Sequence, residues 1–513
     1  MNRPPKKKMA EETKSLRDIR REKLDRLRAK GVDPYPVASR RTHRAADVVA
    51  SFDELEGREV AVAGRLTALR THGKASFADL ADATGKIQLY FKADLLGEKY
   101  ELLELLDLGD FLGAAGKVFR TRTGEVTVAV EDFALLAKGL RTPPVVKTEK
   151  TDEGDVVHDE FADPEKRYRK RYVDMMVNEA ARHRVLAHAA VLRAARRYMD
   201  ERGFVEIETP VLQPLYGGAN ARPFTTYHAD LEMDLYLRIA DELYLKRLLV
   251  GGCEKVYEIG KDFRNEGIDR THYPEFTMLE AYEAYGDYRT MMALTEGLIT
   301  AAAREICGTL TLTYQGRELE LEPPWQNISM VATLNERMKE FGVGDVMTCA
   351  EKELEKVFRL EKLAELWPKV EGRWSRGRAV DVLFDALVVP ELWRPTFVVD
   401  FPAELSPLAK RQRENPALAE RFELFIANME FANAFSEQND PDVQREAFEA
   451  QARARASGDD EAQQLDEDFL EALEYGMPPA GGLGVGVDRV AMILSDAPNI
   501  REVIAFPQLR VKK

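Results

Sequence analysis

The stretch FRNEGIDRTHYPEFTMLEAY (residues 263–282) places charged side chains among aromatic ones in a pattern that could do chemistry. If residues 262–266 and 275–282 form strands, side chains of equal parity lie on one face. The side chains expected on this face are Arg264, Glu266, Phe276, Glu280 and Tyr282. They would offer a guanidinium, a flat ring and carboxylates to one ligand. The alternative is a surface hairpin in which arginine and glutamate form only a structural ion pair.

Several motifs for other chemistries are missing. No GxxxxGK[ST] is present, so any bound ATP does not use a P-loop, and GGLGVGVDR (481–489) lacks the last glycine of GxGxxG. HExxH and GxSxG are also absent. Cys253, Cys307 and Cys349 form no CxxC pair, which disfavours a zinc site and a disulfide framework.

Length and charge limit the class of protein. A chain of 513 residues predicts two or three domains, and its 45% hydrophobic and 32% charged residues indicate a soluble globular protein. No apolar run approaches the roughly 20 residues that span a bilayer, and no secretory signal is evident, so we expect a cytoplasmic protein without a membrane segment. The net charge of -15 argues against indiscriminate nucleic-acid binding, although residues 1–45 are rich in lysine and arginine.

The elements that must position these residues fall into two patterns. Residues 60–136 contain five β-like runs with a helical pattern after the third, which is the order of an OB-fold barrel, although another small barrel remains an alternative. A proline-rich, charged linker and a mixed region without a βαβ rhythm follow, which predicts an α+β domain on a largely antiparallel sheet. The predicted divisions are a basic helical extension (1–48), a barrel (49–143), a linker (144–165) and a catalytic domain (166–513).

Three signatures resemble those of class II aminoacyl-tRNA synthetases. GFVEIETPVL (203–212) resembles motif 1, FRNEG with PEFTMLE (263–280) resembles motif 2, and GGLGVGVDRVAMIL (481–494) resembles motif 3. Within that class, GGANARPF, LYLRIADELYLKRL, PAELSPLAK and NAFSEQND are similar to bacterial lysyl-tRNA synthetases. The resemblance implies activation of L-lysine by ATP, transfer to tRNA(Lys), and an OB-fold domain that binds the anticodon.

The resemblance assigns an ATP site that the chemistry explains. Activation needs a carboxylate to attack the α-phosphate, and a carboxylate is already ionised at neutral pH, so catalysis is positioning and electrostatic stabilisation. Arg264 can bridge the two reacting groups, and Arg489 is expected to hold the γ-phosphate. The expected ATP-binding residues are Arg264, Glu266, His272, Phe276, Glu423 and Arg489, with Arg264 and Arg489 catalytic.

The resemblance also implies a lysine site rich in acids. Glu280, Tyr282 and Glu437 are expected to bind the ε-ammonium, and Gly218 and Glu242 the α-amino group. Asn433, with Arg264, is expected near the substrate carboxylate. Buried acids left unpaired would strongly penalise neutral amino acids.

Metal and tRNA contacts are implied in the same way. Glu423 and Glu430 are expected to hold Mg²⁺ against the phosphates, for which two carboxylates suffice. The expected anticodon contacts are Arg65, Phe77, Gln88 and Glu125. Strand alternation alone leaves open whether Phe77 stacks on a base or points into the barrel core.

Two alternative functions remain at this stage: a ligase that lysylates a protein, and a catalytically silent tRNA-binding protein. A homodimer is expected from the motif 1 helix and the edge strand near Pro210. The sequence departs from the family at Asp241, where proline is common, and at Tyr273, where asparagine is common.

Overall fold

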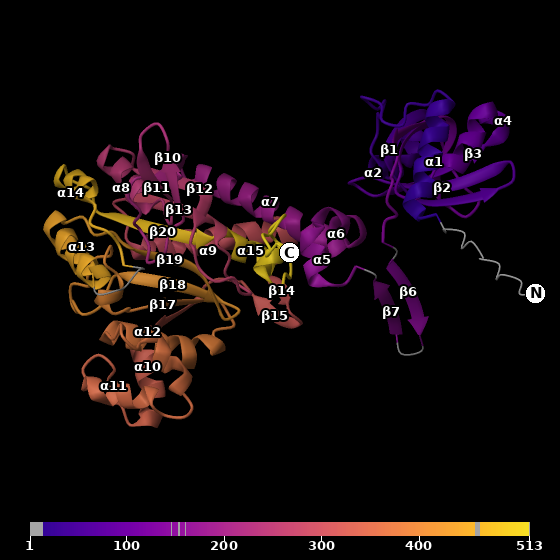
Figure 1. The fold of residues 1–513 in the computed structure, drawn as a ribbon. Helices are drawn as coiled ribbons and strands as arrows, with labels where there is room; N and C mark the ends of the chain where they lie inside the picture. The colour runs from indigo at the N-terminus through magenta and orange to yellow at the C-terminus, as the bar shows by residue number, and fades with distance from the viewer. Residues whose placement is uncertain (1–13, 145, 152–153, 160, 457–461, 512–513) are drawn as a thin grey trace, which may run out of the picture. The chain divides into compact units, whose positions relative to one another are not determined.

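The computed structural model describes residues 14–144, 146–151, 154–159, 161–456 and 462–511. It divides the chain into two compact units, Met1–Ala162 and Asp163–Lys513, which are considered separately. Figure 1 shows the elements of each. Among the described helices, none has both the length and the apolar character needed to cross a bilayer.

The first unit is built on a closed barrel. Its strands are β1 (Glu59–His72), β2 (Ala75–Ala81), β3 (Lys86–Lys92), β4 (Phe111–Arg120) and β5 (Val126–Ala137). They pair in the order β1–β2–β3–β5–β4, so the predicted OB-fold order is confirmed. Side chains alternate along each strand: Ala78 and Leu80 of β2 are buried in the core, whereas Phe77 and Asp79 lie on the outer face.

Short helices complete this unit. They are α1 (Leu16–Ala29), α2 (Ala45–Ala50), α3 (Phe52–Leu55), α4 (Ala93–Leu96) and the 3₁₀ helix η1 (Gly97–Leu105). The predicted helix after the third strand is therefore present as α4 and η1. Part of the predicted basic extension, residues 1–13, lies outside the described residues. The segment expected as a linker contains a two-stranded hairpin, β6 (Val146–Thr151) and β7 (Gly154–Asp159).

The second unit is organised by an eight-stranded sheet. In spatial order its strands are β16 (Gln326–Ser329), β17 (Thr396–Val399), β18 (Arg421–Ile426), β19 (Met429–Ser436), β20 (Ala480–Gly486), β13 (Glu275–Ala284), β12 (Lys255–Phe263) and β8 (Val205–Glu206). The inner pairs are antiparallel, as predicted, and the outermost pairs, β16–β17 and β12–β8, are parallel. Strand β8 lies at the edge, and Pro210 lies outside the strands.

Helices α7 (Glu179–Asp200), α9 (Tyr288–Cys307) and α15 (Val487–Leu494) cover one face of this sheet. Leu279 of β13 and Val485 of β20 point toward them and are fully buried. Helix α7 turns a row of apolar side chains toward the sheet, and Ala195 and Met199 in this row are buried. Because odd positions of β13 face the helices, Phe276, Glu280 and Tyr282 face the other side, which the helices leave open.

The remaining elements surround this open face and the sheet ends. The helices are α5 (Pro164–Arg169), α6 (Arg171–Val177), α8 (Glu242–Val250), α10 (Met330–Met338), α11 (Glu351–Phe358), α12 (Arg376–Leu387), α13 (Pro441–Ala456) and α14 (Glu467–Glu474). The short strands are β9 (Leu212–Gln213), β10 (Thr225–His228), β11 (Met233–Leu237), β14 (Thr311–Tyr314) and β15 (Arg317–Glu320). The 3₁₀ turns are η2 (Lys339–Phe341), η3 (Ala364–Lys369), η4 (Val389–Glu391), η5 (Ala403–Leu405) and η6 (Ile500–Glu502). Helices α10 to α12 pack around a core of their own beside the sheet (Figure 1).

One expected strand has different bounds. The strand expected at residues 262–266 runs instead from Lys255 to Phe263, so Arg264 and Glu266 lie in the loop that follows β12. The loop still starts in register, because the Arg264 N–H donates to the Pro274 carbonyl at 2.9 Å. The parity argument therefore places Arg264 correctly near the sheet face, although Glu266 reaches the cavity from a loop.

Candidate active site

A cavity of about 400 Å³ opens on the uncovered face of the sheet. The three glycines Gly482, Gly484 and Gly486 of β20 form its floor between β13 and β19. Gly484 pairs with Glu280 on one side and with Asn433 on the other, so absent side chains leave the central strand open to a ligand. The cavity brings together most of the predicted ATP and lysine residues: Gly218, Glu242, Arg264, Glu266, His272, Phe276, Glu280, Tyr282, Glu423, Glu430, Asn433 and Arg489.

Arg264 is held at the cavity and forms no ion pair with a carboxylate of the described residues. Its Nε donates to the Ile239 carbonyl at 3.3 Å, and its guanidinium carbon lies 5.0 Å from the Phe276 ring centre. Glu266 and His272 lie on the loop beyond it, and His272 Nδ1 is 2.8 Å from Asp269 Oδ2. The Arg264 guanidinium is therefore available to an anion that enters the cavity.

Tyr282 and Glu280 form a direct contact deep in the cavity. The Tyr282 hydroxyl donates to Glu280 Oε2 at 3.0 Å, and both side chains are at least 95% buried. Burial and the neighbouring Asp262 and Glu242 charges raise the pKa of Glu280 to about 8. This carboxyl therefore lacks a cation that would hold it in its charged form.

Glu437 is fully buried just past β19, behind the glycine floor. A Cβ at Gly482 would overlap its carboxylate and lie 2.6 Å from Tyr282 Cε1, so only glycine admits both side chains. Burial raises the pKa of Glu437 well above its usual value. Glu437 does not itself line the open cavity, but it is next to residues that do.

Lys246 of α8 links two of the predicted lysine ligands. Its ammonium is fully buried and forms ion pairs with Glu242, one helical turn earlier, and with Glu437. The sequence analysis did not single out Lys246, although its i, i+4 spacing from Glu242 could have indicated the pair. Gly218 lies beside Glu242 with a φ of +85°, and a Cβ there would meet the Glu242 Cβ at 3.1 Å.

Glu423 and Glu430 lie on adjacent strands at the other end of the cavity. Glu423 forms an ion pair with Arg421, and Glu430 lies 3.6 Å from Arg489. Burial, together with the Glu430 charge and against the Arg421 charge, raises the pKa of Glu423 to about 8. Asn433 accepts a hydrogen bond from Arg421 Nε at 3.2 Å, so Arg421 is a cavity residue that the sequence analysis missed.

The predicted anticodon residues lie on the barrel. Phe77 points outward and lies 4.9 Å from the Tyr90 ring, which in turn lies 6.0 Å from Phe119. Gln88 is on the same outer face and accepts from the Thr127 hydroxyl at 2.9 Å, and Glu125 is exposed just before β5. Arg65 donates to the Gly109 carbonyl at 2.9 Å and packs over Phe111, so part of its side chain is engaged in the fold. Tyr90 and Phe119 extend this aromatic surface and were missed.

Comparisons with known proteins agree with this division of the chain. The model of the family described as "tRNA synthetases class II (D, K and N)" matches residues 163–510, and that of the "OB-fold nucleic acid binding domain" matches residues 60–136. The chain is 50% identical to the lysine–tRNA ligase of Moorella thermoacetica, covering 97% of this chain and 98% of that protein. It is 49% identical to the lysine–tRNA ligase of Roseiflexus castenholzii, covering 98% of this chain and 100% of that protein. The chain therefore belongs to the class II tRNA synthetases of the D, K and N group.

Proposed function

We propose that the chain activates L-lysine with ATP and transfers the lysyl group to the 3′ end of tRNA(Lys). The relatives named above are lysine–tRNA ligases at about half identity over nearly their full length. The observation that carries the proposal is the cavity itself, in which the buried carboxyls of Glu242 and Glu280 share a lining with the Arg264 guanidinium, which forms no ion pair with any described carboxylate. A cationic amino acid with a free carboxylate fits this cavity, because its cation can pair with the glutamates and its carboxylate with the guanidinium.

In the proposed reaction, the substrate carboxylate attacks the α-phosphate and pyrophosphate leaves. The attacking group is already ionised, so the chain has to align it and stabilise charge on the phosphate oxygens. Arg264 is placed to contact both groups in a bidentate manner, and Phe276 is placed to stack on adenine. Arg489, which is anchored on Glu430 and on the Thr271 carbonyl, is assigned to the γ-phosphate.

Specificity for lysine follows from unmatched negative charge. Glu280 and Glu437 are buried, and both have a raised pKa because of burial. Glu437 is already paired with Lys246, so an ε-ammonium would supply the counter-charge that Glu280 lacks, whereas a neutral side chain would leave Glu280 unpaired. The α-amino group is assigned to Glu242 and Gly218, and the carboxylate to Arg264 and Asn433.

Glu423 and Glu430 fit a divalent cation, which we propose is Mg²⁺ accompanying ATP. Glu423 is partly buried with a pKa raised to about 8, and Glu430 contributes to that rise, so the pair favours a nearby positive charge. When bound, Mg²⁺ would neutralise phosphate charge. Arg421 and Arg489 fix the two carboxylates from either side.

The barrel is proposed to bind the anticodon of tRNA. The outward ring of Phe77, continued by Tyr90, offers a stacking surface for an unpaired base, and Gln88 and Glu125 offer groups for base edges. Arg65 is assigned to the same surface, with only part of its guanidinium free.

The two alternatives are weaker. A protein-lysylating relative would lack the barrel, which this chain has. A silent tRNA-binding protein would be expected to lose Arg264 or Arg489, and both line the cavity.

Pyrophosphate exchange into ATP tests the proposal. Exchange should depend on lysine and not on aspartate or asparagine, and purified tRNA(Lys) should then be charged. Exchange without tRNA charging would favour the protein-lysylating alternative, and no lysine-dependent exchange would favour the silent one.

We also propose a homodimer formed through the β8 edge and acting in the cytoplasm, where translation takes place. Val205, Val211, Leu212 and Leu215 are all exposed apolar residues near that edge. Equilibrium sedimentation at micromolar concentration should give twice the chain mass, and a monomeric mass would refute the dimer.

A further inference from the structure

Asp241 occupies the N-cap position of α8 but does not cap the helix. Aspartate at an N-cap ordinarily accepts hydrogen bonds from the first helical N–H groups. Here the side chain makes no capping bond, and it is 99% buried. A buried carboxyl turned away from the donors of its own helix requires another partner.

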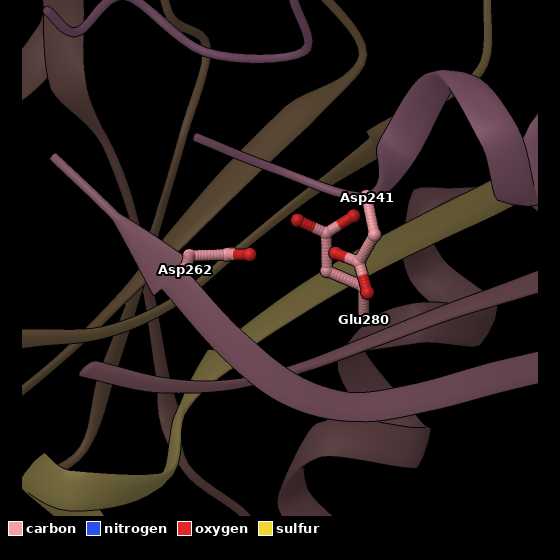
Figure 2. Close-up of side chains that lie close together, drawn as sticks. All are labelled: Asp241, Asp262 and Glu280. Carbon is pink, nitrogen blue, oxygen red and sulfur yellow. The ribbon is translucent and has the colours of Figure 1, made fainter. Parts of the chain in front are cut away.

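The carboxyl of Asp241 is turned instead toward two other acids. Oxygen atoms of Asp241, Asp262 and Glu280 all lie within 4.8 Å of one another. Figure 2 shows the Asp241 and Glu280 carboxyls side by side, with Asp262 directed toward them from the neighbouring strand. All three residues are at least 95% buried.

The Asp241 and Glu280 carboxyls face each other in a buried site, with oxygen atoms within 4.8 Å of one another. Two buried carboxyl groups this close do not both stay charged, and a proton on one of them lets it donate a hydrogen bond to the other. Glu280 also accepts from the Tyr282 hydroxyl at 3.0 Å, which favours its charged form, whereas Asp241 Oδ1 has no hydrogen-bond partner. The proton therefore belongs on Asp241.

We propose that Asp241 is a positioning residue for lysine recognition: its protonated carboxyl donates to Glu280 and holds the Glu280 carboxylate ready for the substrate ε-ammonium. This inference rests on the proposed function and adds a residue that does not touch the substrate. Asp262 is paired with Arg238, whose Nε lies 3.1 Å from Asp262 Oδ1, and although burial raises the pKa of Asp262 to about 6, the group is mostly charged at neutral pH.

The electrostatics of the surrounding groups agree with this assignment. Burial and the Glu280 charge raise the pKa of Asp241 well above its usual value, and the bond from Asp241 lowers that of Glu280. The charged or titratable groups around Glu280 are Glu258 and Asp262 of β12, Arg238, Asp241, Glu242, Lys246, Tyr282, Arg264 and Glu437. Without the Asp241 donor, Glu280 would ionise at higher pH, so lysine would bind less well at neutral pH.

The test measures lysine-dependent pyrophosphate exchange from pH 6.5 to 8.5. Asp241→Ala should raise the lysine KM about tenfold or more at pH 6.5, the scale of one hydrogen bond to a charged group. The ratio of the Asp241→Ala lysine KM to the wild-type lysine KM should become smaller toward pH 8.5. The ATP KM and the kcat at saturating lysine should change less than about twofold. Asp241→Asn keeps a donor and should restore a near wild-type lysine KM at every pH.

Asp287→Ala is the matched control, because Asp287 caps α9 through the Thr290 N–H. It should lower the melting temperature without changing the lysine KM.

The inference is overturned if Asp241→Ala leaves the lysine KM unchanged, or if Asp241→Asn is as impaired as Asp241→Ala. Binding of Mn²⁺ to ATP-free protein that is lost in Asp241→Asn would also overturn it, in favour of a metal site. A wild-type protein without lysine-dependent exchange would refute the proposed function as well.

Discussion

At the scale of single residues, the site depends on buried charges that balance only in part. Lys246 forms ion pairs with both Glu242 and Glu437, whereas Glu280 accepts a hydrogen bond from the Tyr282 hydroxyl and forms no ion pair with any described residue. Burying charged groups costs free energy unless each is paired, so a bound ammonium would offset part of the cost of burying Glu280. On the proposed function, these residues therefore affect both stability and specificity.

Replacing Lys246 by methionine should destabilise the second unit in a pH-dependent way. The change leaves Glu242 and Glu437 unpaired, and burial already raises the pKa of both. When a carboxyl has a higher pKa in the folded protein than in the unfolded chain, the folded protein becomes less stable as the pH rises from the unfolded-state pKa to the folded-state pKa. The expected loss is about 3 to 5 kcal/mol at pH 8 and clearly less at pH 5.5.

Tryptophan fluorescence during denaturant unfolding measures this loss selectively, because Trp325, Trp367, Trp374 and Trp393 all lie in the second unit. Lys255→Met is the control, since the Lys255–Glu283 ion pair at 2.7 Å is partly exposed and should contribute under about 1 kcal/mol. Equal losses for the two variants at both pH values would contradict the account.

At the scale of elements, strand β20 makes the cavity possible. Its glycines let β13 and β19 present Glu280 and Asn433 across an open floor. These relations were predictable in part. Alternation along residues 275–282 correctly placed Phe276, Glu280 and Tyr282 together, because that pattern is local. Periodicity does not encode contacts between distant segments. Such contacts determine where β12 ends, at Phe263, which way the Asp241 side chain points, and how Lys246 packs behind the glycine floor.

Alanine at Gly482 should damage the lysine site. Its Cβ would overlap the Glu437 carboxylate, and overpacking of this kind costs about 1 to 3 kcal/mol. We expect a lower melting temperature and a lysine KM raised by about tenfold or more. Gly484→Ala is the control for stability, since its nearest neighbours lie 3.8 and 3.9 Å away. If both variants melt like the wild type, the close packing of Glu437 against Gly482 is wrong.

At the scale of the whole molecule, two units carry separable tasks. The five-stranded order of the barrel could be predicted from the sequence, because separate runs rich in β-branched and aromatic residues follow one another with a helical pattern after the third. The outward direction of the Phe77 side chain could not be predicted from the sequence, since a one-residue shift in strand register would bury it. Its neighbours Tyr90 and Phe119 come from other strands and are brought beside it only by barrel closure.

Phe77→Ala should separate the two tasks. Loss of one base stack, worth about 1 to 3 kcal/mol, should raise the tRNA KM for charging roughly tenfold or more. Lysine-dependent pyrophosphate exchange should stay unchanged, because it requires no tRNA. Leu95→Ala, an exposed apolar change on α4, should alter neither activity. An effect of Phe77→Ala on exchange but not on charging would contradict the assignment of the barrel to tRNA.

The most direct measurement compares lysine with norleucine, which has the same carbon chain but no ε-ammonium, in pyrophosphate exchange by the wild-type protein. If buried Glu280, with the Lys246-paired Glu437 behind it, awaits a cation near Arg264, kcat/KM should favour lysine by about 10⁴-fold or more. Activation of norleucine within about tenfold of lysine would mean that the acids do not select the substrate, and the account would be wrong.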